Sequence, residues 1–100
     1  MKAQVEGGAL WGVSLATQEI ATLTNGAIDQ DNYDTYTPLR MEDVPEIDVT
    51  VVGDGHYPAG AGEPGVTVTA PAIANAVFAA SGARVRDLPI TPEKIKAALG

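Results

Sequence analysis

The stretch that decides the fold reads GEPGVTVTAPAIANAVFAAS, from Gly62 to Ser81, and Glu63 is its only ionised side chain. Thr69 suits an N-cap, Pro71 suits a first helical turn and Gly82 suits a stop, so the pattern predicts a helix over 69–81. A carboxylate alone among glycines and small apolar residues is either exposed at a loop tip or held in a poorly solvated pocket. In the second case desolvation makes it a stronger general base, which would mark the site of the chemistry.

A second helix is predicted from Gln4 to about Ile20, because apolar residues recur there at helical spacing. No charge occurs between Glu6 and Glu19. A helix that is apolar on almost every side needs partners on more than one face. Gly7, Gly8 and Gly12 would each cost about 1 kcal/mol in an exposed helix, so they indicate close approach by another backbone.

The remaining segments alternate between turn signals and short periodic runs. Asn25-Gly26 predicts a hairpin that joins residues 22–24 to 27–29. Residues 29–46 are polar and interrupted by proline, which favours extended chain and loop, and the alternation over 47–52 predicts a strand. Thr91-Pro92-Glu93 starts a last helix through Leu99. The expected fold class is α+β, with about three helices, a short hairpin and a few strands.

Composition excludes several classes of function. One hundred residues permit one domain, and the net charge of −7, with six scattered basic residues, argues against nucleic-acid binding. The chain has no cysteine, so it holds no disulfide and no thiolate-bound metal or iron-sulfur cluster of its own. The uncharged run 64–83 contains Pro71 and Asn75, which makes it a poor membrane span, and no signal peptide is visible after Met1.

No residue is assigned to a metal site. His56 is the only histidine and has too few ligand-type neighbours, so an exposed loop is expected for it. Asp29-x-Asp31 suggests calcium, but the glycine and the distal glutamate of an EF-hand are absent, which favours a solvated acidic face. Arg84 and Arg86 are expected to tie the last helix to acidic neighbours.

Five segments, taken in order, resemble the carboxy-terminal end of a molybdenum hydroxylase large subunit, in the xanthine dehydrogenase and aldehyde oxidase superfamily. The segments are Gln4-Val5-Glu6-Gly7-Gly8, Tyr33 to Met41, Pro45 to Val49, Gly62-Glu63-Pro64-Gly65 and Ala70 to Phe78. Leu39-Arg40-Met41 with Pro45-Glu46, and Gly82 to Pro89, most resemble the isoquinoline 1-oxidoreductase beta-subunit group. Family members have much longer catalytic subunits. Residues 1–100 are therefore expected to be the C-terminal segment of a molybdopterin-binding domain. The chain would be a shortened expression product, or the product of a truncated or split gene.

The resemblance implies hydroxylation of N-heterocycles or oxidation of aldehydes, with water as the oxygen source. It implies that Glu63 is the catalytic base and that Gln4 and Gly62 bind the cofactor. The cofactor would be molybdopterin, as the cytosine dinucleotide, in the full enzyme, and none is expected on the isolated chain, which would be inactive alone. The implied partners are the upstream part of the large subunit and an iron-sulfur subunit that takes up the electrons.

Two other classes of function remain open from the residues alone. The apolar first helix would suit a stand-alone, non-catalytic interaction or oligomerisation module that keeps the fold and associates with itself. An independent carboxylate hydrolase needs a second acid or a nucleophile near Glu63, and the sequence offers none nearby. The compartment, bacterial cytoplasm or periplasm, is left undecided.

Overall fold

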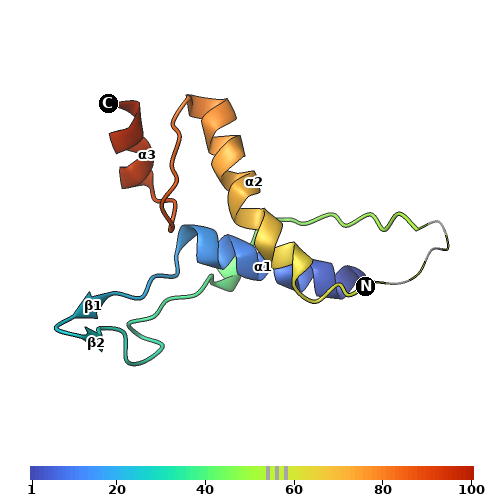
Figure 1. Ribbon diagram of the computed structural model, residues 1–100, viewed down its shortest axis with the longest axis horizontal. Coiled ribbons are helices and arrows are strands. Elements are labelled where there is room, and N and C mark those ends of the chain that lie inside the picture. The colour runs from blue at the N-terminus through green and yellow to red at the C-terminus, as the bar shows by residue number, and fades with distance from the viewer. Residues whose placement is uncertain (54, 56, 58) are drawn as a thin grey trace.

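The computed structural model describes all residues except Asp54, His56 and Pro58. Among the described residues, the chain forms three α-helices and one two-stranded antiparallel sheet, so the predicted α+β class is confirmed (Figure 1). The elements in order are α1 (Lys2–Thr17), β1 (Leu23–Thr24), β2 (Ala27–Ile28), the 3-10 helix η1 (Met41–Asp43), α2 (Pro64–Ser81) and α3 (Pro92–Leu99).

Helix α1 begins two residues before the predicted start and ends three residues before the predicted end. It stops early because the carbonyl of Ser14 accepts two amide hydrogens, from Gln18 at 2.9 Å and from Glu19 at 3.0 Å. Gln18 has already left helical geometry, with φ −132°. The apolar Ile20 therefore lies beyond the helix and is exposed, although its spacing placed it on the helical stripe.

Helices α1 and α2 cross at Gly8 and Gly12, as predicted for these two glycines, whereas nothing lies within 4 Å of a Cβ on Gly7. A Cβ atom on Gly12 would lie 2.5 Å from Cβ of Thr69, and one on Gly8 would lie 3.4 Å from Cα of Gly65. The first turns of α2 therefore lie directly on α1, and the rest of α2 rises away from it (Figure 1). This crossing fixes the start of α2 against the start of α1.

Helix α2 starts at Pro64, so the prediction of a start at Thr69 was wrong. Proline suits the first helical position, because the missing N–H would have no intrahelical partner there. The Thr69 hydroxyl does not cap a helix; it donates to the carbonyl of Gly65 at 2.6 Å. Pro71 lies inside the helix, beyond its first turn. The predicted end is confirmed, since Gly82 terminates the helix at φ 81°.

The hairpin prediction is confirmed and the strand prediction is not. Leu23 pairs with Ile28 and Thr24 with Ala27, around a turn in which Asn25 and Gly26 both have positive φ. Residues 47–52 form no strand, because no partner strand reaches them among the described parts of the chain. These residues have the alternation of a strand but form no hydrogen bonds to a partner strand among the described residues.

The core is small and lies where the segment 83–90 returns to the end of α1. The amide of Ile90 donates to the carbonyl of Ala16 at 2.6 Å. Ala83, Val85 and Ile90 are buried together with Ala16. Helix α3 then begins as predicted, with the amide of Lys94 donating to the Thr91 hydroxyl at 3.3 Å.

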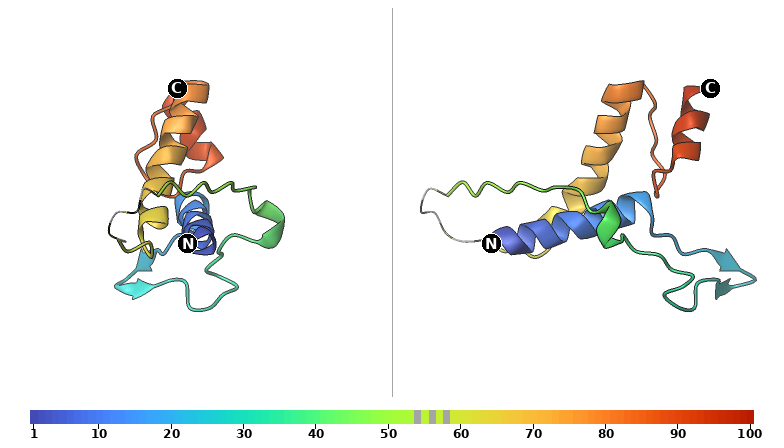
Figure 2. Two further views of the ribbon diagram at one scale, coloured as in Figure 1. Left: turned by 90° about the vertical axis from the view of Figure 1, so that its right-hand side faces the viewer. Right: turned by 180° about the vertical axis from the view of Figure 1, so that it is seen from behind.

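The overall shape is open, as the three views show (Figures 1 and 2). The radius of gyration is 16.1 Å, against roughly 13 Å for a compact domain of this length. The accessible surface is 7473 Å², against about 5,400 Å² for a compact monomer of this mass. Within the described residues, no helix is both long and apolar enough to span a bilayer. The chain thus leaves much of its surface uncovered.

Candidate functional site

The starts of α1 and α2 come together at the residues that the sequence singled out. Gln4 lies in the first turn of α1 and Gly62 lies just before α2, 58 residues later. The side-chain amide Nε2 of Gln4 donates to the carbonyl of Gly62 at 3.3 Å. The glycine crossing below them makes this approach possible, because two side chains at Gly8 and Gly65 would hold the helices apart. Glu63 follows directly.

Glu63 is the N-cap residue of α2, and its backbone, not its side chain, serves that role. Its carbonyl accepts the amides of Val66 at 3.0 Å and Thr67 at 3.4 Å. Its carboxylate caps no backbone N–H, and the residue is exposed. Of the two environments expected for this carboxylate, the chain presents the exposed one. The described residues therefore form no poorly solvated pocket around this carboxylate.

The groups at these two helix starts fit the edge of a pterin ring. A glutamine amide carries two donor hydrogens and an acceptor oxygen, and the bond to Gly62 uses one donor. Gln4 is exposed, and nothing lies within 4 Å of the position of a Cβ on Gly62. The pair therefore leaves both hydrogen-bonding capacity and space. The described residues gather no group of three metal-ligating side chains.

A polar network lies on another face of α1, and no sequence motif pointed to it. The Ser14 hydroxyl donates to the Glu19 carboxylate and accepts the amide of Leu39 at 2.8 Å. The Tyr36 hydroxyl donates to the same carboxylate. This hydrogen bond is the main cause that raises the pKa of Tyr36 above its usual value, and burial and the Glu19 charge add to it. The network ties residues 36–39 to α1.

Next to this network lies an apolar groove of about 740 Å³. Trp11 stands in it with 61% of its surface exposed. The other residues that line the groove include Gly7, Leu10, Leu15, Tyr33, Pro38 and Val44. The surface of α1 that the sequence predicted to need a partner is therefore only partly covered within this chain.

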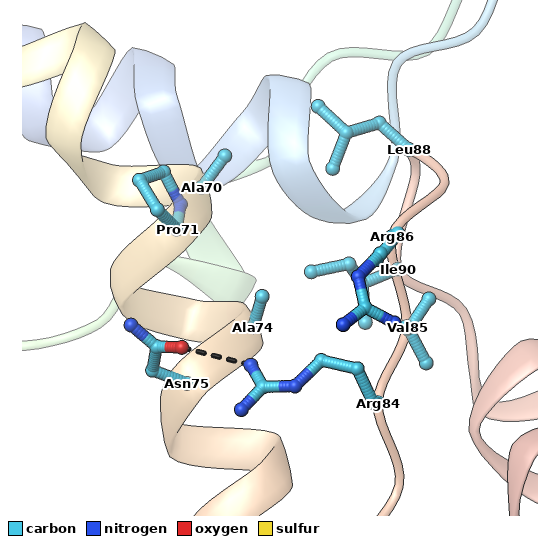
Figure 3. Close-up of a pocket in the computed structure, with 9 residues that line it drawn as sticks. All are labelled: Ala70, Pro71, Ala74, Asn75, Arg84, Val85, Arg86, Leu88 and Ile90. Atoms are coloured by element: carbon cyan, nitrogen blue, oxygen red, sulfur yellow. Dashed lines mark hydrogen bonds between the residues drawn. The ribbon is translucent and has the colours of Figure 1, made fainter.

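A second pocket, of about 490 Å³, lies between α2 and the segment 84–90 (Figure 3). Arg84 donates from Nη1 to Oδ1 of Asn75 at 2.8 Å, and its guanidinium lies 4.0 Å from the ring centroid of Phe78. The expectation that Arg84 ties the last helix to acidic neighbours is thus wrong, since it contacts α2. Arg86 lines the same pocket, together with the buried Val85 between the two arginines.

Among the described residues, the acidic pair that suggested calcium lies away from the starts of α1 and α2. Asp29 belongs to the hairpin, where its carboxylate accepts the Thr22 hydroxyl at 2.5 Å. His56 lies outside the residues that the structure describes.

Comparison with known proteins places these residues in a family. No family model matches the chain. The chain is 47% identical, over 94% of its length, to a membrane-bound aldehyde dehydrogenase (pyrroloquinoline-quinone) of Gluconacetobacter polyoxogenes. It is 38% identical, over 92% of its length, to the beta subunit of isoquinoline 1-oxidoreductase of Brevundimonas diminuta. This chain belongs to the molybdenum hydroxylase family.

The molybdenum hydroxylase relatives are far longer than the chain. The chain spans 12% of the length of each of the two relatives named above. A third relative, a nicotinate dehydrogenase subunit from Pseudomonas putida, is 36% identical over 97% of the chain, which spans 8% of that protein. All three relatives are dehydrogenases or oxidoreductases by name. The resemblance inferred from the motifs is confirmed, and the roles of Gln4, Gly62 and Glu63 stay predictions.

Proposed function

We propose that this chain is the C-terminal part of a molybdenum-dependent oxidoreductase that hydroxylates N-heterocycles or oxidises aldehydes, with oxygen taken from water. It supplies the catalytic base, Glu63, and is inactive alone. The observation that carries the proposal is the hydrogen bond from Gln4 to Gly62, directly beside Glu63. Two segments 58 residues apart meet at the two motifs that the family resemblance assigns to one site. The substrates named for the relatives, aldehydes and nitrogen heterocycles, support the reaction class.

Each of the three residues has a distinct task in this proposal. Gln4 binds the cofactor edge with the donor and the acceptor that its bond to Gly62 leaves free. Gly62 keeps space open beside that edge, since any side chain would occupy it. A carboxylate oxygen of Glu63 takes the proton from the attacking oxygen. Molybdopterin, as the cytosine dinucleotide, would supply the oxygen-transfer and electron-accepting chemistry when bound.

Glu63 can do this only inside a larger protein. It is exposed in this chain, and an exposed carboxylate is a weak base at neutral pH. The upstream part of the large subunit is proposed to close over it and to exclude water. The electrons are proposed to pass to an iron-sulfur subunit, because this chain has no cysteine to hold a cluster.

The substitution Glu63→Gln in the full enzyme tests the base. The amide keeps the shape of the side chain but cannot accept the proton, so turnover should fall about 10²- to 10⁴-fold, the usual contribution of a general base. Molybdenum content should stay near the wild-type value. Glu46→Gln, which changes another exposed carboxylate, is the matched control and should leave turnover almost unchanged. A molybdenum-loaded Glu63→Gln enzyme within a few-fold of wild type contradicts the assignment.

Cofactor analysis of the same preparations tests the class of chemistry. The relative of Gluconacetobacter polyoxogenes carries pyrroloquinoline quinone in its name, whereas the family resemblance implies molybdopterin. Elemental analysis of the full enzyme should find molybdenum in proportion to the large subunit. A quinone without molybdenum in an active preparation would overturn the molybdenum proposal.

A second candidate, a stand-alone interaction module, is favoured by one observation. The apolar groove on α1 leaves Trp11 mostly exposed, and such a surface needs a cover. In the first proposal the upstream part covers it, whereas in the second a further copy of the chain does. The upstream coding sequence separates the two, since only the first proposal requires it to encode the remainder of a large subunit.

A further inference from the structure

The segment 47–52 has the composition of a β-strand. It reads Ile47-Asp48-Val49-Thr50-Val51-Val52. Five of these six residues are β-branched, and β-branched residues favour the pleated backbone of a sheet. Its first four residues alternate in exposure, with Ile47 and Val49 half-buried and Asp48 and Thr50 exposed. Such alternation with a period of two is typical of a strand with one covered face.

The structure leaves this strand-like segment without a partner among the described residues. Residues 47–52, named the arm, run as an extended trace that passes over the N-terminal half of α1 (Figures 1 and 2). No backbone hydrogen bond joins the arm to any described residue outside it. An exposed strand edge with unpaired amides and carbonyls is a template for another strand.

We propose that the arm is a docking strand, which adds to a sheet edge in the upstream part of the large subunit. The inference rests on the proposed function, because that function supplies the upstream part. The arm presents Ile47 and Val49 to the core of the receiving sheet and Asp48 and Thr50 to its solvent side. Main-chain hydrogen bonds give the affinity, and the alternate apolar side chains fix the register.

Charge and length favour the upstream part as the occupant over a second copy. Residues 42–52 hold four carboxylates and no basic residue, and each copy of the chain carries a net charge of −7. Two copies would therefore bring like charges together, which opposes pairing. The chain spans only 12% of its relatives, so the larger part of such a protein lies outside it. The receiving strand is expected to present Lys, Arg or neutral residues beside Asp48.

Hydrogen exchange, followed by mass spectrometry, tests the docking strand in the full, molybdenum-loaded enzyme. Amides of the arm should exchange at least about 100-fold more slowly there than in the 100-residue chain, because ladder pairing must open before exchange. The hairpin turn at Asn25-Gly26 serves as the internal control. Equal exchange of the arm in both samples overturns the proposal and leaves the proposed function standing. An enzyme without molybdenum instead counts against the proposed function.

A matched pair of substitutions in the full enzyme separates strand docking from a general effect of charge. Val49→Asp places a carboxylate on the half-buried face. It should either abolish the protection of the arm's amides from hydrogen exchange or prevent the enzyme from being obtained in soluble form. Thr50→Asp places the same charge on the exposed face and should keep both the protection and the solubility. Equal effects of the two substitutions would contradict a docked strand of which only one face is buried. Protection in the isolated chain that disappears on dilution would assign the arm to a second copy and overturn the proposal.

Discussion

The carboxylate of Asp29 is held by hydroxyl groups of its own hairpin. The Thr22 hydroxyl donates to Oδ2 at 2.5 Å. This hydrogen bond, followed by a second from Thr24, lowers the pKa of Asp29 below the ordinary aspartate value of 3.8. A lowered folded-state pKa means that the ionised carboxylate stabilises the folded hairpin. This contribution is present above pH 3.8 and is lost as the pH falls through the lower, folded-state value.

A pH titration tests this sign. The carboxyl carbon of Asp29, followed by NMR, should titrate below the ordinary aspartate value. The substitution Thr22→Val should move its midpoint upward, towards that value, because the larger of the two hydrogen bonds is lost. Thr50→Val, far from the hairpin in the fold, should leave the midpoint in place. A midpoint that does not respond to Thr22→Val would show that the hydroxyl does not hold the carboxylate.

At the scale of single residues, motifs identified the site but could not give its surroundings. Gln4, Gly62 and Glu63 were named from the sequence, and the structure brings Gln4 and Gly62 into contact beside Glu63. The exposure of Glu63 was not predictable, because the solvation of a side chain depends on tertiary neighbours that its local motif does not specify. The hydrogen bond of Tyr36 to Glu19 was missed for a related reason: Tyr36 meets Glu19 only once the chain has turned back on α1. The bond of Ser14 to Glu19 was missed because α1 ends at Thr17, before Glu19, and the predicted helix did not.

Two glycines of one helix differ in what surrounds them, which gives a test at the scale of elements. A Cβ on Gly12 would lie 2.5 Å from Cβ of Thr69, whereas nothing lies within 4 Å of a Cβ on Gly7. Gly7→Ala should stabilise the chain by about 0.5–1 kcal/mol, through helix propensity alone. Gly12→Ala should instead destabilise it by roughly 1–3 kcal/mol, because α1 and α2 must move apart.

Urea unfolding of the purified chain, followed by circular dichroism at one fixed concentration, measures both changes. In the full enzyme Gly12→Ala should also lower turnover, since the crossing that it disrupts holds Gly62 beside Gln4. If Gly12→Ala stabilised the chain as much as Gly7→Ala, the close crossing of the two helices would be refuted.

Local signals predicted elements well where the determinants are local. The Asn25-Gly26 turn and the Thr91 cap decide their elements within a few residues, and both predictions are confirmed. The start of α2 was placed too late, because Thr69 suits a cap equally well, whereas within the helix its hydroxyl donates to the carbonyl of Gly65 four residues earlier. A strand needs a partner, so alternation at 47–52 could not form a sheet in this chain.

At the scale of the whole molecule, the chain behaves as a part rather than a complete core. No large side chain of the described residues is fully buried, and the surface exceeds that of a compact monomer. Burial of apolar area supplies most of the free energy of folding, so an open chain of this kind has little stability of its own. The amino-acid composition, with few aromatic residues and many alanines, also favours thin, close-packed helices over a thick core.

The uncovered groove on α1 gives the last prediction. Trp11 lies in the groove with 61% of its surface exposed, whereas Tyr57 is 99% exposed and does not line it. The isolated chain should bind a hydrophobic dye and should associate as its concentration rises, because a contiguous apolar surface attracts both. Trp11→Ser should reduce dye fluorescence and association, and Tyr57→Ser, the matched control, should change neither.

Dye titration and analytical ultracentrifugation measure these two properties on the same samples. In the full large subunit the dye signal should disappear, because the upstream part covers the groove. A dye signal that persisted there would mean that the groove faces another subunit instead. If the chain remained monomeric at high concentration and bound no dye, residues 33–44 would already cover the apolar surface of α1. The prediction that α1 needs a further partner would then be wrong.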